Sequence, residues 1–338
     1  MRPPRHIRPS LLGAALAAAL AAALAGVARA AAPAVWLERM NHALTHLDYQ
    51  GTFAHWQSGR VQMLRIIHRM KNGVVSERLQ SLDGSGRELI RTGTRLTCYL
   101  PDRHEALVEH VPPDSSLIAT LPVYDRHIAR FYAIHEGPRL RVDRHETRLI
   151  TVMPRDRYRY GYRLWIDRAG MPLKIQLWNV DHGGQVVEQI AFATLTIDAH
   201  IPNSAFTPHL STVGYRWLRN RAAPPPPSGG LSWIAAWLPP GFHMATHVVQ
   251  VMPGAPGPVD HLVYTDGLAS VSVFIERHAE PRATHPAIEA AHMGASYVFS
   301  TIVDGHRVTA VGQAPALTVR SIASSVRAVP PAAPDPTP

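Results

Sequence analysis

Cysteine is almost absent from this sequence, because Cys98 is the only one among 338 residues. An intramolecular disulfide is therefore excluded, and so is any metal site built on a pair of cysteines. Zinc-protease motifs are missing too. Ala-Leu-Val follows His104-Glu105, and Ala106 stands where the reversed motif ending at His110 needs its first histidine. The sequence gives no support to a zinc enzyme.

Other catalytic motifs are equally absent. Gly84-Ser85-Gly86 lacks the spacing of a nucleophile elbow, and neither a phosphate-binding glycine loop nor a dinucleotide fingerprint occurs. The 20 histidines are scattered, which is typical of solvated or locally hydrogen-bonded side chains. We therefore predict a protein that is not an enzyme and has no catalytic, cofactor-binding or metal-ligating residues.

Long apolar runs are lacking except in the first thirty residues. Three arginines precede the Ala- and Leu-rich stretch Leu11–Val27, and Ala28-Arg29-Ala30 supplies small residues for cleavage. A helix over that stretch would rise about 25 Å, less than the roughly 30 Å of a bilayer core, so an uncleaved anchor is the weaker interpretation. We expect a signal peptide over residues 1–30, cleaved after Ala30, and export of a soluble protein.

Acidic side chains are outnumbered, with 25 Asp+Glu against 34 Lys+Arg. Cleavage after Ala30 would remove four arginines and leave a net charge near +5. Arginine supplies nearly all of this excess and forms paired hydrogen bonds with carboxylates and phosphates. An exported cationic protein meets acidic protein segments, lipid phosphates or glycans rather than nucleic acid, although a solvated basic surface explains any single arginine equally well.

The most informative stretch is Arg157–Val180. Tyrosine and aliphatic side chains alternate with arginine before a turn predicted at Asp167–Pro172, and the alternation resumes after it, so we expect a long hairpin with one apolar and one cationic face. In one interpretation the apolar face is core and the other face is solvated. In the other, the hairpin lines a cavity for an acyl chain. The candidate cavity wall is Tyr158, Tyr160, Tyr162 and Leu164, and the candidate ligand or partner rim is Arg157, Arg159, Arg163 and Trp165.

Helical spacing is found over Trp36–Leu47 and Tyr124–Ile134, and again near the C-terminus around Leu317–Val326. Strand patterns bounded by turn residues fill most of the remaining chain. The expected strands include Tyr49–Gln57, Val61–Lys71, Val74–Asp83, Leu96–Leu100, Thr147–Met153, Val186–Ile197, His243–Val251, Asp260–Tyr264, Leu268–Glu276, Ser296–Val303 and Arg307–Gly312.

A run of four prolines divides the chain, since it can neither continue a helix nor lie inside a sheet. We expect a Pro-rich linker over residues 200–231. Residues 31–199 then form an N-terminal domain, 232–328 a smaller C-terminal domain, and 329–338 a disordered tail with five prolines after residue 329.

Collinear sequence blocks from about Trp36 to Val326 resemble the MucB/RseB family of periplasmic sigma-factor (sigma-E/AlgU-type) regulatory proteins, whereas residues 112–143 match poorly. The blocks include Trp36-Leu37-x-Arg39-Met40, Glu77-Arg78-Leu79-x-Ser81-Leu82-Asp83-Gly84, Cys98-Tyr99-Leu100-Pro101-Asp102, Arg159-Tyr160-Gly161-Tyr162-Arg163-Leu164-Trp165-x-Asp167, Trp237-Leu238-Pro239-Pro240-Gly241-Phe242 and Tyr264-x-Asp266-Gly267-Leu268.

The resemblance implies an α+β fold, with an N-terminal antiparallel half-barrel over helices, similar to LolA-type lipoprotein carriers, and a smaller C-terminal α+β domain. It also implies a negative regulator of the envelope-stress sigma factor. Such a regulator binds the periplasmic domain of a transmembrane anti-sigma factor (MucA/RseA-like) and shields it from regulated proteolysis. Lipid, lipopolysaccharide or the acyl chains of a mislocalised lipoprotein are the implied releasing ligands, and homodimer formation is left open.

Two alternatives use the same exported chain differently. A periplasmic lipid or lipoprotein carrier needs only the half-barrel, so the second domain and the linker favour the regulator. A periplasmic hydrolase is disfavoured because neither a catalytic triad nor metal-ligand spacing is present.

Overall fold

The computed structural model describes residues 33–111, 117–118, 121, 127–180, 183–197, 200–219, 221–222, 232–252, 255, 257–277 and 290–329. The expected signal peptide, the proline run and residues 330–338 lie outside the described residues. Within the described part of the chain, no helix is long and apolar enough to cross a membrane.

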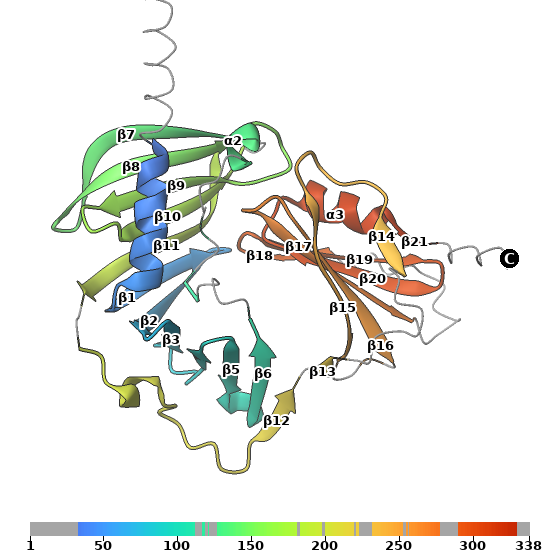
Figure 1. Ribbon diagram of the computed structural model, residues 1–338, viewed down its shortest axis with the longest axis horizontal. Coiled ribbons are helices and arrows are strands. Elements are labelled where there is room, and N and C mark those ends of the chain that lie inside the picture. The colour runs from blue at the N-terminus through green and yellow to red at the C-terminus, as the bar shows by residue number, and fades with distance from the viewer. Residues whose placement is uncertain are drawn as a thin grey trace, which may run out of the picture.

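A 12-stranded open sheet forms the N-terminal part of the molecule, in the order β12-β6-β5-β4-β3-β2-β1-β11-β10-β9-β8-β7 (Figure 1). All neighbours pair antiparallel except β12, which runs parallel to β6. The strands are β1 (Tyr49–Gln57), β2 (Arg60–Lys71), β3 (Val74–Ser81), β4 (Glu88–Thr92), β5 (Arg95–Leu100), β6 (Glu105–His110), β7 (Tyr132–Val142), β8 (His145–Pro154), β9 (Gly161–Asp167), β10 (Pro172–Asn179), β11 (Gln185–Ile197) and β12 (Arg216–Arg219).

The inner face of this sheet packs against the N-terminal helix, which spans residues 33–46 and is the blue helix crossing the sheet in Figure 1. Leu37, Met40 and Ala43 on the helix are buried against Phe53 and Leu164 of the sheet. They belong to one continuous core, because the helix presents an apolar stripe and each strand directs alternate side chains toward it. The expected amphipathic helix is confirmed.

The outer face of β3–β6 is covered by the segment after β11. Arg69 on β2 donates to the carbonyl oxygen of Ile201 at 2.6 Å, and Arg78 on β3 pairs with Glu88 on β4 at 2.7 Å. This segment, with the short helix η2 (Asn203–Phe206), leads into β12. The start of the expected linker is thus ordered structure on the large sheet. A second short helix, η1 (Pro101–Arg103), joins β5 to β6.

The turn between β2 and β3 shows how local sequence sets the register of the sheet. Asn72 and Gly73 have φ angles of 52° and 75°, as a two-residue hairpin turn with two left-handed residues requires. Asp304-Gly305, with φ angles of 48° and 72°, makes the equivalent turn in the second sheet. Both turns lie in gaps between the expected strands, Val61–Lys71 and Val74–Asp83 for the first, Ser296–Val303 and Arg307–Gly312 for the second.

The C-terminal part contains a seven-stranded sheet in the order β13-β15-β16-β17-β20-β19-β18 and a two-stranded sheet, β14-β21. Helix α3 (Ala316–Ser324) packs on β19 and β20 through Val319 and Ile322, so this part has its own core. The predicted α+β architecture with a smaller C-terminal domain is confirmed. The strands are β13 (Arg221–Ala222), β14 (Trp233–Ala235), β15 (His243–Val251), β16 (Pro258–Thr265), β17 (Ser270–Arg277), β18 (Ala290–Met293), β19 (Ser296–Val303), β20 (His306–Gly312) and β21 (Val326–Ala328).

Two local expectations were wrong. The helix expected over Tyr124–Ile134 is restricted, among its described residues, to α2 (Ile128–Phe131), and Tyr132 already begins β7. Apolar residues at helical spacing do not distinguish a helix from a short strand. The first strand of the hairpin also begins at Gly161 rather than Arg157, because residues 155–160 form bends outside the sheet.

Candidate functional site at the boundary between the domains

The apolar side of the predicted hairpin is mostly core. Tyr160, Tyr162 and Leu164 are 7%, 3% and 0% exposed and lie in the cluster around the N-terminal helix. Burial raises the pKa of Tyr160 to about 12 and also raises that of Tyr162 above its ordinary value. Tyr158 is half-buried and packs edge-on against Trp237 of the C-terminal domain, with ring centroids 5.5 Å apart. This candidate wall is thus packed in the N-terminal core and against the second domain.

The residues of the predicted rim are dispersed. Arg157 is exposed and precedes Tyr158, in the segment before β9. On the outer face of the sheet, the Arg163 guanidinium lies 5.1 Å from the Trp178 ring centroid, and the Lys174 ammonium lies 4.7 Å from that of Trp165. Such contacts stabilise half-exposed sheet surfaces. The structure does not bring these residues together with Tyr162 and Leu164, which point to the opposite face.

Arg159, the remaining rim candidate, is fully buried at the boundary between the domains. Its Nη1 lies 3.0 Å from Oδ2 of Asp266 in the turn after β16, and both side chains are 0% exposed. Its Nε lies 3.1 Å from Oδ1 of Asp156, and Nη2 donates to the carbonyl oxygen of Pro240. The guanidinium therefore contacts both domains, which is a different role from that of a rim residue.

Aromatic rings surround this guanidinium. Its carbon lies 4.8 Å from the ring centroid of Phe131 and 5.4 Å from those of Tyr132 and Phe242. The Tyr132 hydroxyl also donates to Oδ2 of Asp266 at 3.0 Å. Burial, together with the neighbouring Asp266 carboxylate, raises the pKa of Tyr132 well above its ordinary value, so the phenol stays protonated and can donate. The Arg159 charge is thus enclosed by rings from both domains.

Backbone geometry brings the two domains this close. Gly241 has a φ angle of 86°, and a Cβ atom at this position would lie 2.3 Å from the Phe131 ring. Only glycine allows the turn before β15 to approach that ring. Nearby, the Thr318 hydroxyl on α3 donates to the carbonyl oxygen of Tyr158 at 2.6 Å.

A second cluster at the boundary centres on Glu188 of β11. Its carboxylate lies 2.8 Å from Nε2 of His55 on β1 and accepts hydrogen bonds from the Gln313 side chain at 3.1 Å and the Ala295 backbone at 3.4 Å. The backbone N–H of Gly294 donates to the Ser58 hydroxyl at 2.8 Å. This cluster also joins the domains, because three of its residues are N-terminal and three are C-terminal: His55, Ser58 and Glu188 on one side, Gly294, Ala295 and Gln313 on the other.

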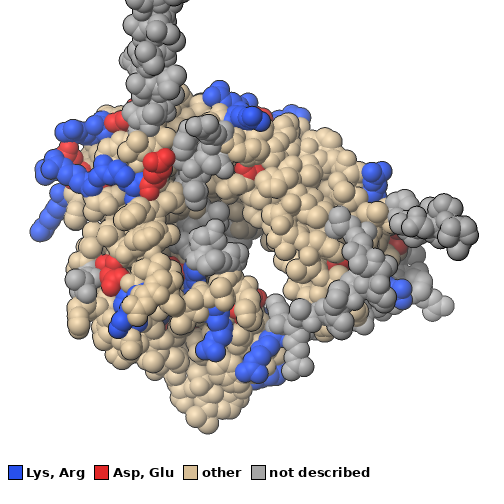
Figure 2. Space-filling model, viewed as in Figure 1, with Lys and Arg blue, Asp and Glu red and all other residues tan. Residues whose placement is uncertain are grey.

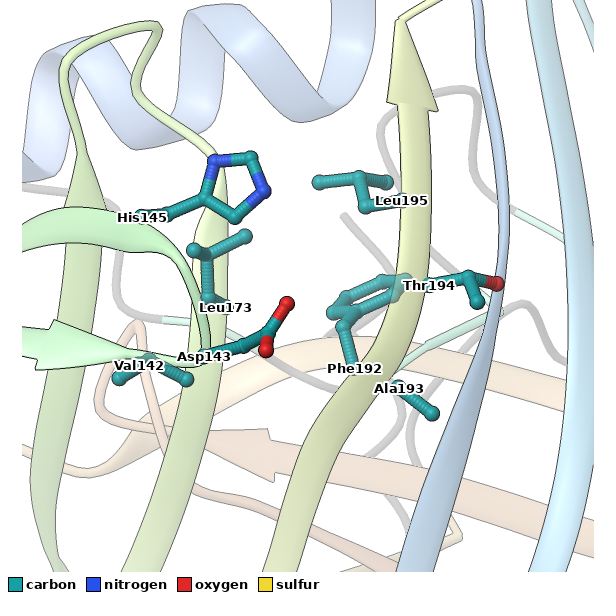
Figure 3. A pocket seen from close by; sticks show the side chains of 8 residues that line it. All are labelled: Val142, Asp143, His145, Leu173, Phe192, Ala193, Thr194 and Leu195. Carbon is teal, nitrogen blue, oxygen red and sulfur yellow. The ribbon is translucent and has the colours of Figure 1, made fainter.

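A small pocket lies on the inner side of the large sheet, with a volume of about 30 Å³ (Figure 3). Asp143 and His145, from the turn between β7 and β8, face the apolar side chains of Leu173, Phe192 and Leu195. None of the hairpin's candidate residues lines this pocket. This volume lies far below the range typical of small-molecule sites.

The charged surface shows no metal site in the part of the chain that the structure describes, since it holds no group of three or more His, Cys, Asp or Glu side chains able to bind one. Figure 2 shows Lys and Arg in separate groups, with one over the β7–β8 turn. There, Arg139 and Arg168 pair with Glu146 at 3.3 Å and 2.9 Å. Cys98 is a half-buried free thiol whose pKa is raised, mainly by burial.

Comparison with known families accounts for both parts of the molecule. The family model for the MucB/RseB N-terminal domain matches residues 32–210, and that for the MucB/RseB C-terminal domain matches residues 227–327. The chain belongs to the MucB/RseB family.

Relatives of this MucB/RseB protein match it over nearly their whole length. The sigma factor AlgU regulatory protein MucB of Pseudomonas aeruginosa is 31% identical over 310 residues, covering 88% of this chain and 92% of that protein. The sigma-E factor regulatory protein RseB of Escherichia coli K12 is 26% identical over 294 residues, covering 86% and 89%. Both relatives carry the name of regulatory proteins.

Solved structures agree with the sequence relationship. The crystal structure of MucB in complex with MucA(peri) has a TM-score of 0.65 and 29% identity, covering 87% of this chain and 97% of that one. The crystal structure of MucB alone has a TM-score of 0.61 and 28% identity, covering 88% and 98%. These matches span both domains, so the fold predicted from the resemblance is confirmed.

Sequence reasoning missed the partners of Arg159 at this site. Asp266 falls between the expected strands Asp260–Tyr264 and Leu268–Glu276, and Tyr132 falls within the expected helix Tyr124–Ile134. One signal was available, because the blocks that resemble the MucB/RseB family include Arg159, Pro240-Gly241-Phe242 and Asp266-Gly267. No spacing rule connects these blocks, since they meet only after both domains have folded.

Proposed function

We propose that this protein binds the periplasmic segment of a transmembrane anti-sigma factor and acts as a negative regulator of the envelope-stress sigma factor. The observation that carries the proposal is the match, across both domains, to MucB crystallised with MucA(peri). A carrier that needed only the large sheet would not require the second domain, which has its own core and a buried polar boundary with the first.

The proposed mechanism is protection. While bound, the protein covers the anti-sigma segment and keeps the first protease of its degradation pathway away. Lipid, lipopolysaccharide or a mislocalised lipoprotein then favours a state with lower affinity for the segment, and the segment is released. A ligand can act this way only if it binds the two states with different affinity. The apolar N-terminal sequence supports a location in the periplasm, where these ligands and the segment meet.

A binding experiment tests the first step. The chain from residue 31 onward is titrated with the periplasmic segment of the anti-sigma factor from the same organism, using calorimetry, with a scrambled segment of equal composition as the control. We expect saturable one-to-one binding of the native segment alone. Equal heats for the native and scrambled segments would refute the proposal.

Protease protection and lipid response test the remaining steps. A periplasmic site-1 protease should cut the free segment faster than the bound one, and lipopolysaccharide should restore cutting. Native mass spectrometry separates the regulator from the carrier. Stoichiometric acyl cargo on a protein that never binds the segment would favour the carrier, whereas a protein–segment complex that lipid dissociates favours the regulator.

A further inference from the structure

The ion pair between Arg159 and Asp266 joins two domains that each have a core of their own. The pair is 0% exposed on both sides at a separation of 3.0 Å, although the surrounding elements come from segments about a hundred residues apart. Asp266 further accepts from the Tyr132 hydroxyl through Oδ2 and from the backbone N–H groups of Leu268 and Ala269 through Oδ1, at 2.9 Å and 2.7 Å. Its carboxylate is therefore fixed within its own turn before it meets Arg159.

The guanidinium is equally constrained from the N-terminal side. Asp156 lies at its Nε, and the rings of Phe131 and Tyr132 pack beside it. The guanidinium is a rigid plane whose Nη1 forms the ion pair with Asp266 and whose Nη2 donates to the Pro240 carbonyl oxygen, so both contacts hold only over a narrow range of relative positions of the two domains. The pair thus specifies orientation more sharply than an apolar contact of the same size would.

The energetics of such a pair suit a contact that opens and closes. Attraction between two fully buried charges is largely offset by the loss of their hydration, so a buried pair contributes little net stability. Removing one partner is costly, because it leaves the other charge buried and uncompensated. When the domains separate, by contrast, water hydrates both charges, and this hydration offsets much of the lost attraction between them. The arrangement in which Arg159 and Asp266 are paired is therefore well defined, and the two domains can separate without either of them unfolding.

We propose that Arg159 is the positioning residue of this molecule: its ion pair with Asp266 sets the arrangement of the two domains that binds the anti-sigma segment, and breaking the pair releases that arrangement. This inference rests on the proposed function for its binding part. Arg159 acts through domain orientation rather than by touching the segment, since its side chain has no exposed surface.

The test uses three single variants of the chain from residue 31 onward. Arg159→Gln removes the positive charge. Asp266→Asn removes the negative charge and keeps the Oδ1 atom that accepts from Leu268 and Ala269. Arg157→Gln is the matched control, because Arg157 is two residues away and exposed. The double variant Arg159→Gln/Asp266→Asn contains two neutral amides and no unpaired buried charge.

Domain orientation is measured by electron spin resonance between two spin labels. The labels are placed at Val61 on β2 and Val248 on β15, which are 62% and 40% exposed, in a background with Cys98→Ser. Parent and Arg157→Gln should give one narrow distance distribution. Arg159→Gln and Asp266→Asn should give a broadened or displaced distribution while near-ultraviolet circular dichroism remains that of a folded protein. The double variant should return toward the parent distribution.

Affinity for the periplasmic segment is measured on the same proteins. We expect a loss of about tenfold or more in both single variants and partial recovery in the double variant. Unchanged distances in the folded single variants would overturn the positioning role. Changed distances with unchanged affinity would overturn the coupling and leave the proposed function intact. If the parent itself does not bind the segment, the proposed function fails, and the distances alone decide whether Arg159 positions the domains. Should Arg159→Gln fail to fold, Asp266→Asn and the double variant decide the question.

Discussion

Protonation of His68 should make the protein less stable as the pH falls. The ring is 1% exposed on β2, stacks on Tyr49 with centroids 4.8 Å apart, and has Nδ1 2.9 Å from the Leu47 carbonyl oxygen. Burial lowers the pKa of His68 from 6.5 to about 4, and the Arg91 charge adds to this, whereas Leu47 and the nearby Asp48 act in the opposite direction. The folded protein therefore holds this imidazole neutral.

The sign and size of the effect follow from these two pKa values. In the unfolded chain His68 takes up its proton near pH 6.5, whereas in the folded protein it does so only near pH 4. Stability is thus fully present above pH 6.5 and is lost as the pH falls toward 4. A difference of this size corresponds to about 3 kcal/mol, since one pKa unit is worth about 1.4 kcal/mol.

Urea unfolding of the parent and His68→Gln between pH 4 and 7.5 measures this contribution. Glutamine does not titrate in this range and can donate to the Leu47 carbonyl oxygen. The difference in free energy of unfolding between the two proteins, followed against pH, therefore reports on His68 alone. Between pH 7 and pH 4, the free energy of unfolding of the variant relative to the parent should rise by about 3 kcal/mol. His110→Gln, at an exposed position on β6, is the control for the substitution itself. If the difference in free energy of unfolding between His68→Gln and the parent does not change with pH, the reasoning is refuted.

Three further predictions concern the same sheet. Burial raises the pKa of Glu77 to about 7, against the opposing effect of Arg91, so the protein loses stability as the pH rises from 4.5 to 7. In urea unfolding, the free energy of unfolding of Glu77→Gln relative to the parent should therefore rise by about 3 kcal/mol over that range. Leu164→Ala, at a 0% exposed core position, should cost about 2–5 kcal/mol in urea unfolding, and a loss below about 1 kcal/mol would contradict tight packing there. Gly161→Ala should cost about 1–3 kcal/mol, because its Cβ would lie 2.4 Å from the Trp178 ring; near-neutral stability would show that the ring moves freely.

Strands with two unlike faces and a turn signal at each end were predictable from the sequence. The bounds observed for β1, β15 and β19 coincide with those expected. Period-two alternation applies wherever the backbone stays extended, and Asn72-Gly73 fixes where the chain reverses. The sequence was sufficient to predict these elements, because the position of each strand and turn depends on residues within a few positions of it in the chain.

The edge strand β7 was not predictable in this way. Its burial pattern lacks alternation, and a register shift separates Glu136 from Arg139 around Pro138. The extra residue at this register shift interrupts the alternation, so side chains on either side of it need not follow one pattern of core and solvent. The apolar residues near Tyr132 then fit a helix as well as a strand, and only pairing with β8 decides between them.

Arg159 illustrates a different limit. Alternation grouped it with Arg157 and Arg163 on a solvated face, but residues 155–160 leave the sheet, so the rule no longer applies to them. Its partner Asp266 belongs to the other domain, and nothing in the spacing of the two residues predicts their meeting. A buried charge pair between domains is determined by tertiary assembly, which sequence periodicity does not encode.

The strands β12 and β13 have a mechanical consequence. β12 ends at Arg219 on the edge of the large sheet, and β13 begins at Arg221 on the edge of the smaller one. Two Cα steps of 3.8 Å are all that separate these edges along the chain, so they cannot move far apart. Figure 1 places this tether at the opposite end of the molecule from α2 and α3. Because these two edges stay close together, a rotation of one domain against the other would change the distance between α2 and α3 more than the distance between β12 and β13.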